Sequence, residues 1–180
     1  FGLTTLMGIY SDELDYYGFD VNSAELYNHN VTHSNTTLLG WWSNAYNLIY
    51  EANDIIVGVE NTGSLNTVDK ERFKGQALFV RAFMHSLLMT IYGDVPYITT
   101  TNYLENNSVA RLPVTIVFDN IISDLTNAVS LLENTSATGE RVLPSRDAAL
   151  ALLSRIYLYV QNWEMAESTA TELINMHSLG

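Results

Sequence analysis

Apolar residues that recur at spacings of three and four run through most of this chain, and this spacing limits its fold more than any other feature. The clearest case begins at Leu38 and continues to Val59. Residues three and four apart share one face of an α-helix, so this stretch predicts an amphipathic helix. Helical patterns also follow further along, and the expected helices cover about residues 38–59, 68–92, 113–132, 144–160 and 163–177. We therefore predict an all-α fold in which helices pack on helices.

Turn residues separate these stretches. Gly93 and Pro96 end the second expected helix, whereas Pro113 and Pro144 open the third and fourth, where proline fits the first turn. The connection between Val95 and Leu112 is expected to be a loop.

Residues 1–37 have a different character. They contain Gly2, Gly8 and Gly18 and a polar stretch at 28–37, with no sustained helical or strand period beyond a possible short helix at 3–10. We expect this segment to be mostly loop, to lack a core of its own, and to pack on a helical scaffold formed by residues 38–180.

The net charge excludes two classes of partner. The chain of 180 residues has 20 Asp and Glu against 8 Lys and Arg, a formal net charge of −12, and residues 1–69 hold nine acids and no Lys or Arg. Such a chain repels nucleic acid and anionic lipid headgroups. A hydrophobic content of 47% with 16% charged residues is typical of a packed globular protein. With no cysteine, the redox compartment stays open.

One long apolar stretch, residues 75–93, raises the question of a membrane span. It contains Gln76, Arg81 and His85, each of which is costly in hydrocarbon. We therefore expect a helix buried in a protein core.

Arg81 needs an anionic partner in that setting, because its neighbours are large and apolar. We predict a buried ion pair with Asp124, Glu51 or Asp54 on a facing helix.

The last two expected helices are joined by a short turn, which is typical of a helical-hairpin repeat. In a tetratricopeptide unit, small and aromatic residues at fixed spacings let the two helices approach each other. Five residues have this spacing and are expected to be buried between the helices: Ser154, Tyr157, Ala166, Ala170 and Leu173. A tetratricopeptide-like solenoid is the predicted architecture.

No compact catalytic signature occurs in the chain. The phosphate-binding loop, the hydrolase serine elbow, the zinc-protease helix and the dinucleotide-binding turn are all absent. His29 and His33 are four residues apart and would share a helix face, but their polar and β-branched neighbours favour a loop. We predict no catalytic residue, no metal site and no cofactor.

Residues 11–20 mix aromatic rings with carboxylates, and the candidate ligand-binding residues are Asp12, Glu13, Tyr16, Tyr17, Phe19 and Asp20. Flat rings stack on the C–H faces of sugars, and carboxylates accept hydrogen bonds from sugar hydroxyls. Two alternatives stay open. The rings could cap the helical core, or a carboxylate pair could cleave a glycoside, although no spacing here fixes the geometry that this reaction needs.

Two adjacent tryptophans begin the first long helix. Because neighbours on a helix point in different directions, we expect one of Trp41 and Trp42 to be buried and the other to be exposed as a stacking ring.

Four segments in order carry a family resemblance: WWSNAYNLIYEANDII, KGQALFVRAFMHSLLMTIYGDVPYI, RLPVTIVFDNIISDLTNAVSLL and RVLPSRDAALALLSRIYLYVQNWEMAESTATELI. The most specific parts are RAF followed by YGDVP, Arg111 before a helix that ends in DLTNA, and AALALLSRIYLY followed by Trp163. Over about residues 38–177, this set resembles the SusD/RagB family of Bacteroidetes.

The resemblance implies a function. Family members are surface-exposed outer-membrane lipoproteins that capture nutrients, mostly glycans, for a SusC-like TonB-dependent transporter, and they are not enzymes. In the family, loops hold the glycan. The first of these loops corresponds here to Ser11-Asp12-Glu13 followed by Tyr16, Tyr17 and Phe19. The implied partners are an oligosaccharide and the transporter, with no nucleic acid and no cofactor. Membrane attachment is implied only through a lipid anchor upstream of this chain.

The resemblance also implies that this chain is the N-terminal, repeat-bearing part of a longer protein, because family members are two to three times longer. A pure protein-interaction scaffold of tetratricopeptide type is the alternative function, and a peptide ligand in place of a glycan is also open.

Overall fold

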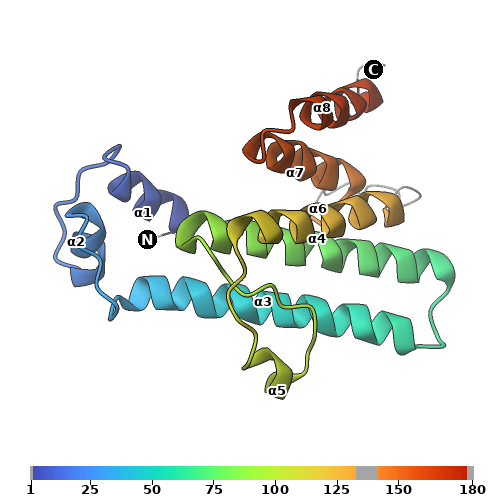
Figure 1. The fold of residues 1–180 in the computed structure, drawn as a ribbon, viewed down its shortest axis with the longest axis horizontal. Helices are drawn as coiled ribbons and strands as arrows, with labels where there is room; N and C mark the ends of the chain where they lie inside the picture. Colours follow the sequence, from blue (N-terminus) through green and yellow to red (C-terminus); the bar gives the residue numbers. More distant parts are fainter. Residues whose placement is uncertain (1, 133–141, 178–180) are drawn as a thin grey trace. The chain divides into compact units, whose positions relative to one another are not determined.

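The computed structural model describes residues 2–132 and 142–177, and the described residues form helices and no β-strand (Figure 1). The prediction of an all-α fold is confirmed. The chain divides into two compact units, residues 1–44 and 45–180. Residues 134–141, which join the third and fourth expected helices and were expected to be a loop, lie outside the described residues.

The first unit contains helices α1 (Leu3–Tyr10) and α2 (Val21–Tyr27) and the start of α3 (Thr36–Asn61). The possible helix at 3–10 is confirmed. Helix α2 was not predicted, because its seven residues are too short to show a helical period.

The first unit also has a small core of its own, which corrects the expectation that residues 1–37 would lack one. Leu6 and Ile9 from α1 and Leu26 from α2 are buried together, and these three residues are called the Leu6 cluster below. Partly buried side chains pack against them, including Leu38 and Trp41 from the first turns of α3. Two short helices can therefore share one apolar cluster that neither could bury alone.

The second unit is a series of long helices: the rest of α3, then α4 (Thr67–Tyr92), α6 (Val114–Leu131), α7 (Arg146–Tyr159) and α8 (Trp163–His177). Their ends agree with the predicted ones to within two residues. Figure 1 shows α3 and α4 as an antiparallel hairpin, and α6 packs on α4, α7 on α6, and α8 on α7. No helix within the described ranges is both long and apolar enough to cross a membrane.

Local capping explains where several of these helices begin and end. The Asn66 side chain accepts from the Asp69 amide at the start of α4, and the Ser145 side chain accepts from the Ala148 amide at the start of α7. At the end of α4, Gly93 has a φ of 71°, a conformation that a side chain disfavours.

Gly75 allows α4 and α6 to approach closely. A Cβ atom at this position would lie 2.8 Å from Cγ of Leu132 and 3.2 Å from Cβ of Leu131. The absence of a side chain at Gly75 therefore sets the spacing of these two helices.

The α7–α8 hairpin has the predicted repeat packing. Tyr157 and Ala166 are buried, and the Ser154 hydroxyl donates to the Ala166 carbonyl at 3.2 Å. Ser154, Ala170 and Leu173 are half-buried, so the prediction that all five residues are buried holds for Tyr157 and Ala166 alone. The small residues lie where the two helices meet, as the spacing requires.

The connection between α4 and α6 is closed at its base. The Leu112 amide donates to the Val95 carbonyl at 3.0 Å, forming an isolated antiparallel bridge, and the Val114 amide donates to the Asp94 carboxylate at 3.0 Å. Within the expected loop lies the short helix α5 (Tyr103–Asn106), which was not predicted.

Candidate functional site

The predicted ligand-binding residues lie on the loop between α1 and α2, within the first unit. Tyr17 and Phe19 are the most exposed of the rings, at 86% and 101%. Glu13 is exposed as well, whereas Tyr16 is half-buried against the Leu6 cluster. The loop therefore carries two solvent-exposed aromatic rings together with several carboxylates.

Tyr16 holds the end of this loop. Its hydroxyl accepts from the Asp20 amide at 2.8 Å and donates to the Asp20 carbonyl at 3.3 Å. A Cβ atom on Gly18 would lie 2.5 Å from the Tyr16 hydroxyl oxygen, so the ring lies directly against Gly18.

The Asp20 carboxylate caps α2. It accepts from the Ser23 amide at 2.8 Å and from the Ser23 hydroxyl at 2.7 Å. These hydrogen bonds, the side-chain one first, lower the pKa of Asp20 below its ordinary 3.8. Asp20 therefore carries a full charge in neutral solution and orders the start of the helix.

Asp12 and His29 join the start of the loop to the end of α2. The His29 Nε2 lies 3.2 Å from Asp12 Oδ1, and the His29 ring lies 5.0 Å from that of Tyr10. Asp12 and His29 have φ values of 60° and 51°, in the left-handed region that few side chains adopt. Contacts at both ends of the loop therefore hold an unusual backbone in place.

Asp15 lies between two tyrosines. The Tyr17 hydroxyl donates to Asp15 Oδ2 at 3.3 Å, and the Tyr27 hydroxyl donates to Oδ1 at 3.4 Å. The negative charge of Asp15 is the main cause that raises the pKa of Tyr27. Sequence reasoning did not select Asp15, although it stands among the candidates in the same acidic run.

The tryptophan prediction is wrong. Trp41 and Trp42 are both half-buried, and Trp41 packs against the Leu6 cluster. The first turns of α3 belong to the first unit, and both tryptophan side chains are partly buried there. Both histidines considered for a metal, His29 and His33, are exposed. Within the described residues, no three His, Cys, Asp or Glu side chains are grouped to hold a metal ion.

In the second unit, Arg81 forms the predicted buried ion pair, and Asp124 is the partner. Arg81 Nη2 donates to Asp124 Oδ1 at 2.6 Å and Nε donates to Oδ2 at 2.7 Å, while Nη1 donates to Asn53 at 2.8 Å. The bidentate contact and the amide satisfy all three guanidinium nitrogens inside the protein. Arg81 is therefore a structural residue.

His85 extends this polar cluster to the segment after α4. Its ring stacks on Tyr97 at 3.8 Å, its Nδ1 lies 2.8 Å from the Arg81 carbonyl, and its Nε2 accepts from the Ile98 amide at 3.1 Å. Burial of the ring lowers its pKa to about 4. His85 is therefore neutral at pH 7 and acts as a hydrogen-bonded core residue.

Two further bonds fix the segment 96–100. The Asn53 amide donates to the Ile98 carbonyl at 3.1 Å, and the Tyr46 hydroxyl donates to the Pro96 carbonyl at 2.8 Å. The cluster of Arg81, Asp124, Tyr97, Asn53 and His85, called the polar core below, therefore anchors this segment to the helices.

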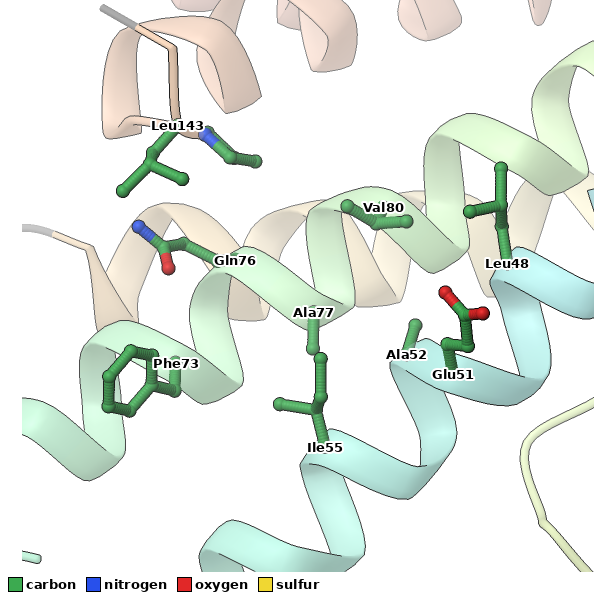
Figure 2. A pocket seen from close by; sticks show the side chains of 10 residues that line it. Leu48, Glu51, Ala52, Ile55, Phe73, Gln76, Ala77, Val80 and Leu143 are labelled. Carbon is green, nitrogen blue, oxygen red and sulfur yellow. The ribbon is translucent and has the colours of Figure 1, made fainter.

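Two hollows of the second unit are lined by described residues. One, of about 290 Å³, is an apolar groove between α3, α4 and the residues before α7, with Glu51 and Gln76 as its polar side chains. Figure 2 shows Ile55 and Ala77 pointing toward each other across it, with Leu143 on the side of Gln76. The groove offers few hydrogen-bonding groups for a sugar.

The other hollow, of about 450 Å³, is more polar and has Arg81 and Asp124 in its lining. Lys74 pairs with Glu60 at 2.5 Å at the same place. These four charges already have partners within the protein, so the hollow offers no unpaired charge from them to a ligand.

Comparison with known proteins identifies the family. Residues 9–158 match the SusD-like family model, described as starch-binding and associating with the outer membrane. The chain belongs to this SusD-like family. The resemblance found in the sequence is confirmed.

Relatives agree in sequence and structure. A SusD-like protein of Formosa agariphila is 31% identical over 155 residues, which cover 84% of this chain and 30% of that protein. A SusD superfamily structure from Bacteroides vulgatus has a TM-score of 0.78 at 26% identity, covering 88% of this chain and 34% of that one. A crystal structure with a xylogluco-oligosaccharide has a TM-score of 0.78 at 25% identity, covering 94% and 36%. The chain thus spans about a third of the length of these relatives.

Proposed function

We propose that this chain is the helical N-terminal part of a non-catalytic protein that binds glycans at the cell surface. It delivers them to a SusC-like TonB-dependent transporter. The protein is attached to the outer membrane by a lipid anchor upstream of this chain, and α3, α4 and α6–α8 form its scaffold.

The exposed rings of Tyr17 and Phe19 are the observation that carries the proposal. A large aromatic ring that is fully exposed to water costs free energy, and two such rings lie on this loop with only Gly18 between them. Stacking against a sugar ring covers such a surface while leaving the sugar hydroxyls free for polar partners.

Carboxylates on the same loop provide those partners. Asp12 and Glu13 are exposed, with Asp20 at the other end of the loop. We assign Asp12, Glu13, Tyr16, Tyr17, Phe19 and Asp20 to the glycan site, of which Tyr17 and Phe19 stack on the sugar. The xylogluco-oligosaccharide in a related structure supports an oligosaccharide as the ligand class.

A binding role without catalysis is supported by how the loop uses its carboxylates. Asp20 is held by Ser23, and Asp12 by His29. Glycoside cleavage needs one carboxylic acid and a second carboxylate, acting as base or nucleophile, on either side of the scissile bond. Asp12 and Asp20 are instead engaged by neighbouring side chains, and each keeps further lone pairs that can accept hydrogen bonds from sugar hydroxyl groups.

Binding by the full-length protein that carries this chain tests the proposal. Isothermal titration against starch- and xyloglucan-derived oligosaccharides is expected to give saturable binding. The double variant Tyr17→Ala with Phe19→Ala should reduce the affinity at least tenfold, because large aromatic side chains contribute most of the binding energy at such interfaces. Tyr159→Ala, which removes a 55% exposed ring from α7, is the matched control and leaves affinity unchanged.

Two results oppose the proposal. If no oligosaccharide binds, the glycan function is wrong. If binding survives the loss of Tyr17 and Phe19, the loop is not the site, and a scaffold role for these repeats is favoured.

A further inference from the structure

We propose that Tyr16 and Gly18 are positioning residues that fix the loop in the shape that presents Tyr17 and Phe19 to the ligand. This inference rests on the proposed function. It divides the aromatic residues of the loop into one that holds the backbone and two that contact the glycan.

The geometry supports this division. Tyr16 makes two hydrogen bonds with the backbone of Asp20, one as acceptor and one as donor, and so closes the chain over four residues. Its ring is half-buried against the Leu6 cluster, which fixes the ring to the helices. Tyr17 and Phe19 lie between the two ends of this closure, and both point into solvent.

Gly18 is needed for space. Its φ is not in the left-handed region, so its backbone suits any residue. A Cβ atom, however, would lie 2.5 Å from the hydroxyl oxygen, 2.7 Å from Cζ and 2.8 Å from Cε2 of Tyr16. These atoms are at the far end of a side chain, so an added methyl group displaces the ring and breaks its bonds to Asp20.

The loop is also held at its other end. Asp12 contacts His29 at the end of α2, and Asp20 caps the start of the same helix. A loop that is fixed at both ends, and closed between Tyr16 and Asp20, does not need to be ordered by the ligand, which saves conformational entropy on binding.

Gly18→Ala in the full-length protein tests the inference. We expect it to weaken binding of the oligosaccharide that binds the unmodified protein by about tenfold, the cost of ordering two side chains and their loop on binding. Gly63→Ala is the matched control, because a Cβ atom there has nothing within 4 Å. It should leave affinity and melting temperature unchanged.

A double-mutant cycle shows whether the effect passes through the ring. In a Tyr16→Leu background, which keeps an apolar contact with the Leu6 cluster, Gly18→Ala should add less than a twofold change. Amide hydrogen exchange without ligand gives an independent measurement, since the Asp20 amide should lose protection in Tyr16→Phe and in Gly18→Ala.

The outcomes separate this inference from the proposed function. Unchanged affinity in Gly18→Ala, with binding lost in Tyr17→Ala with Phe19→Ala, overturns the positioning role and leaves the glycan site standing. Additive effects of Gly18→Ala and Tyr16→Leu, or an unchanged Asp20 amide, also overturn it. Binding that survives loss of both exposed rings overturns the site and the positioning role together.

Discussion

The hydroxyl of Tyr97 donates a hydrogen bond to Asp124 Oδ2 at 2.6 Å, and the same carboxylate oxygen accepts from Arg81 Nε. Tyr97 belongs to the segment that follows α4, and Asp124 lies on α6. One carboxylate therefore ties a helix, a neighbouring helix and the connection between them to each other. Burial is the main reason that the pKa of Tyr97 is raised, so its hydroxyl keeps its proton.

Removing one member of the buried pair should be costly. Arg81→Met leaves the Asp124 carboxylate buried without its cation, and we expect the free energy of unfolding to fall by about 3 to 5 kcal/mol. Denaturant unfolding measures this change. Lys74→Met, which breaks the exposed pair with Glu60, is the control and should cost at most about 1 kcal/mol.

Replacing both members should cost less than replacing one. Arg81→Met with Asp124→Leu leaves no buried charge, so we expect this variant to be more stable than either single variant. A double variant as unstable as the sum of the two would contradict the role assigned to the pair.

His85 should make stability depend on pH between its two pKa values. The unfolded imidazole takes up a proton near pH 6.5, whereas the folded one stays neutral until about pH 4. The unfolded state therefore binds more protons in this window, and stability falls as pH falls, by about 3 kcal/mol in total. Above pH 6.5 His85 contributes no slope.

The free energy of unfolding, measured from pH 7 to pH 5, tests this dependence on His85. The carboxylates with a lowered pKa, Asp20 and Glu25, change stability mainly below this range. His85→Gln should be less stable at pH 7 and nearly flat over the window. An equally steep slope in that variant would show that another group is responsible.

Gly75→Ala should destabilise the α4–α6 contact. Its methyl group meets Leu132 at 2.8 Å, and overpacking of this kind costs about 1 to 3 kcal/mol. Gly58→Ala on α3 is the control, since nothing lies within 4 Å of the new atom. There the better helix propensity of alanine should raise stability by about 0.5 to 1 kcal/mol. Thermal unfolding of the two variants should thus shift in opposite directions.

Asp20 should act through its capping bond. Asp20→Asn keeps an acceptor for the Ser23 amide, whereas Asp20→Ala does not. We expect amide exchange of Ser23 to accelerate in the alanine variant and to stay slow in the asparagine variant. Equal exchange in both would mean that the cap does not hold α2.

The long helices could be predicted from the sequence because their signals are local. Apolar spacing defines each helix, and residues such as Pro113 and Gly93 mark where one begins or ends. The need of Arg81 for a carboxylate partner could also be predicted locally, because its neighbours within the helix are apolar. Which carboxylate it is depends on how three helices pack, and the sequence left three candidates.

Features that depend on distant partners could not be predicted. Helix α2 has only two turns, too few to show a helical period. Its N-cap residue, Asp20, was selected from the sequence only as a candidate ligand-binding carboxylate near aromatic residues. His85 owes its role to Ile98, thirteen positions away, and to the ring of Tyr97. Neither contact leaves a pattern along the chain. Within the loop at 11–20, no pattern along the chain distinguishes the hydrogen-bonded Tyr16 from the exposed Tyr17.

The polar core determines the order in which the helices of the second unit should unfold. Stacked helical hairpins can open from one end, because each touches only its neighbours. Here buried bonds link α3, α4, α6 and the segment 96–100, so none of them can leave without breaking bonds to the others. They should unfold as one cooperative block with the slowest-exchanging amides of the unit. The α7–α8 hairpin contributes no side chain to the polar core, and it should open first.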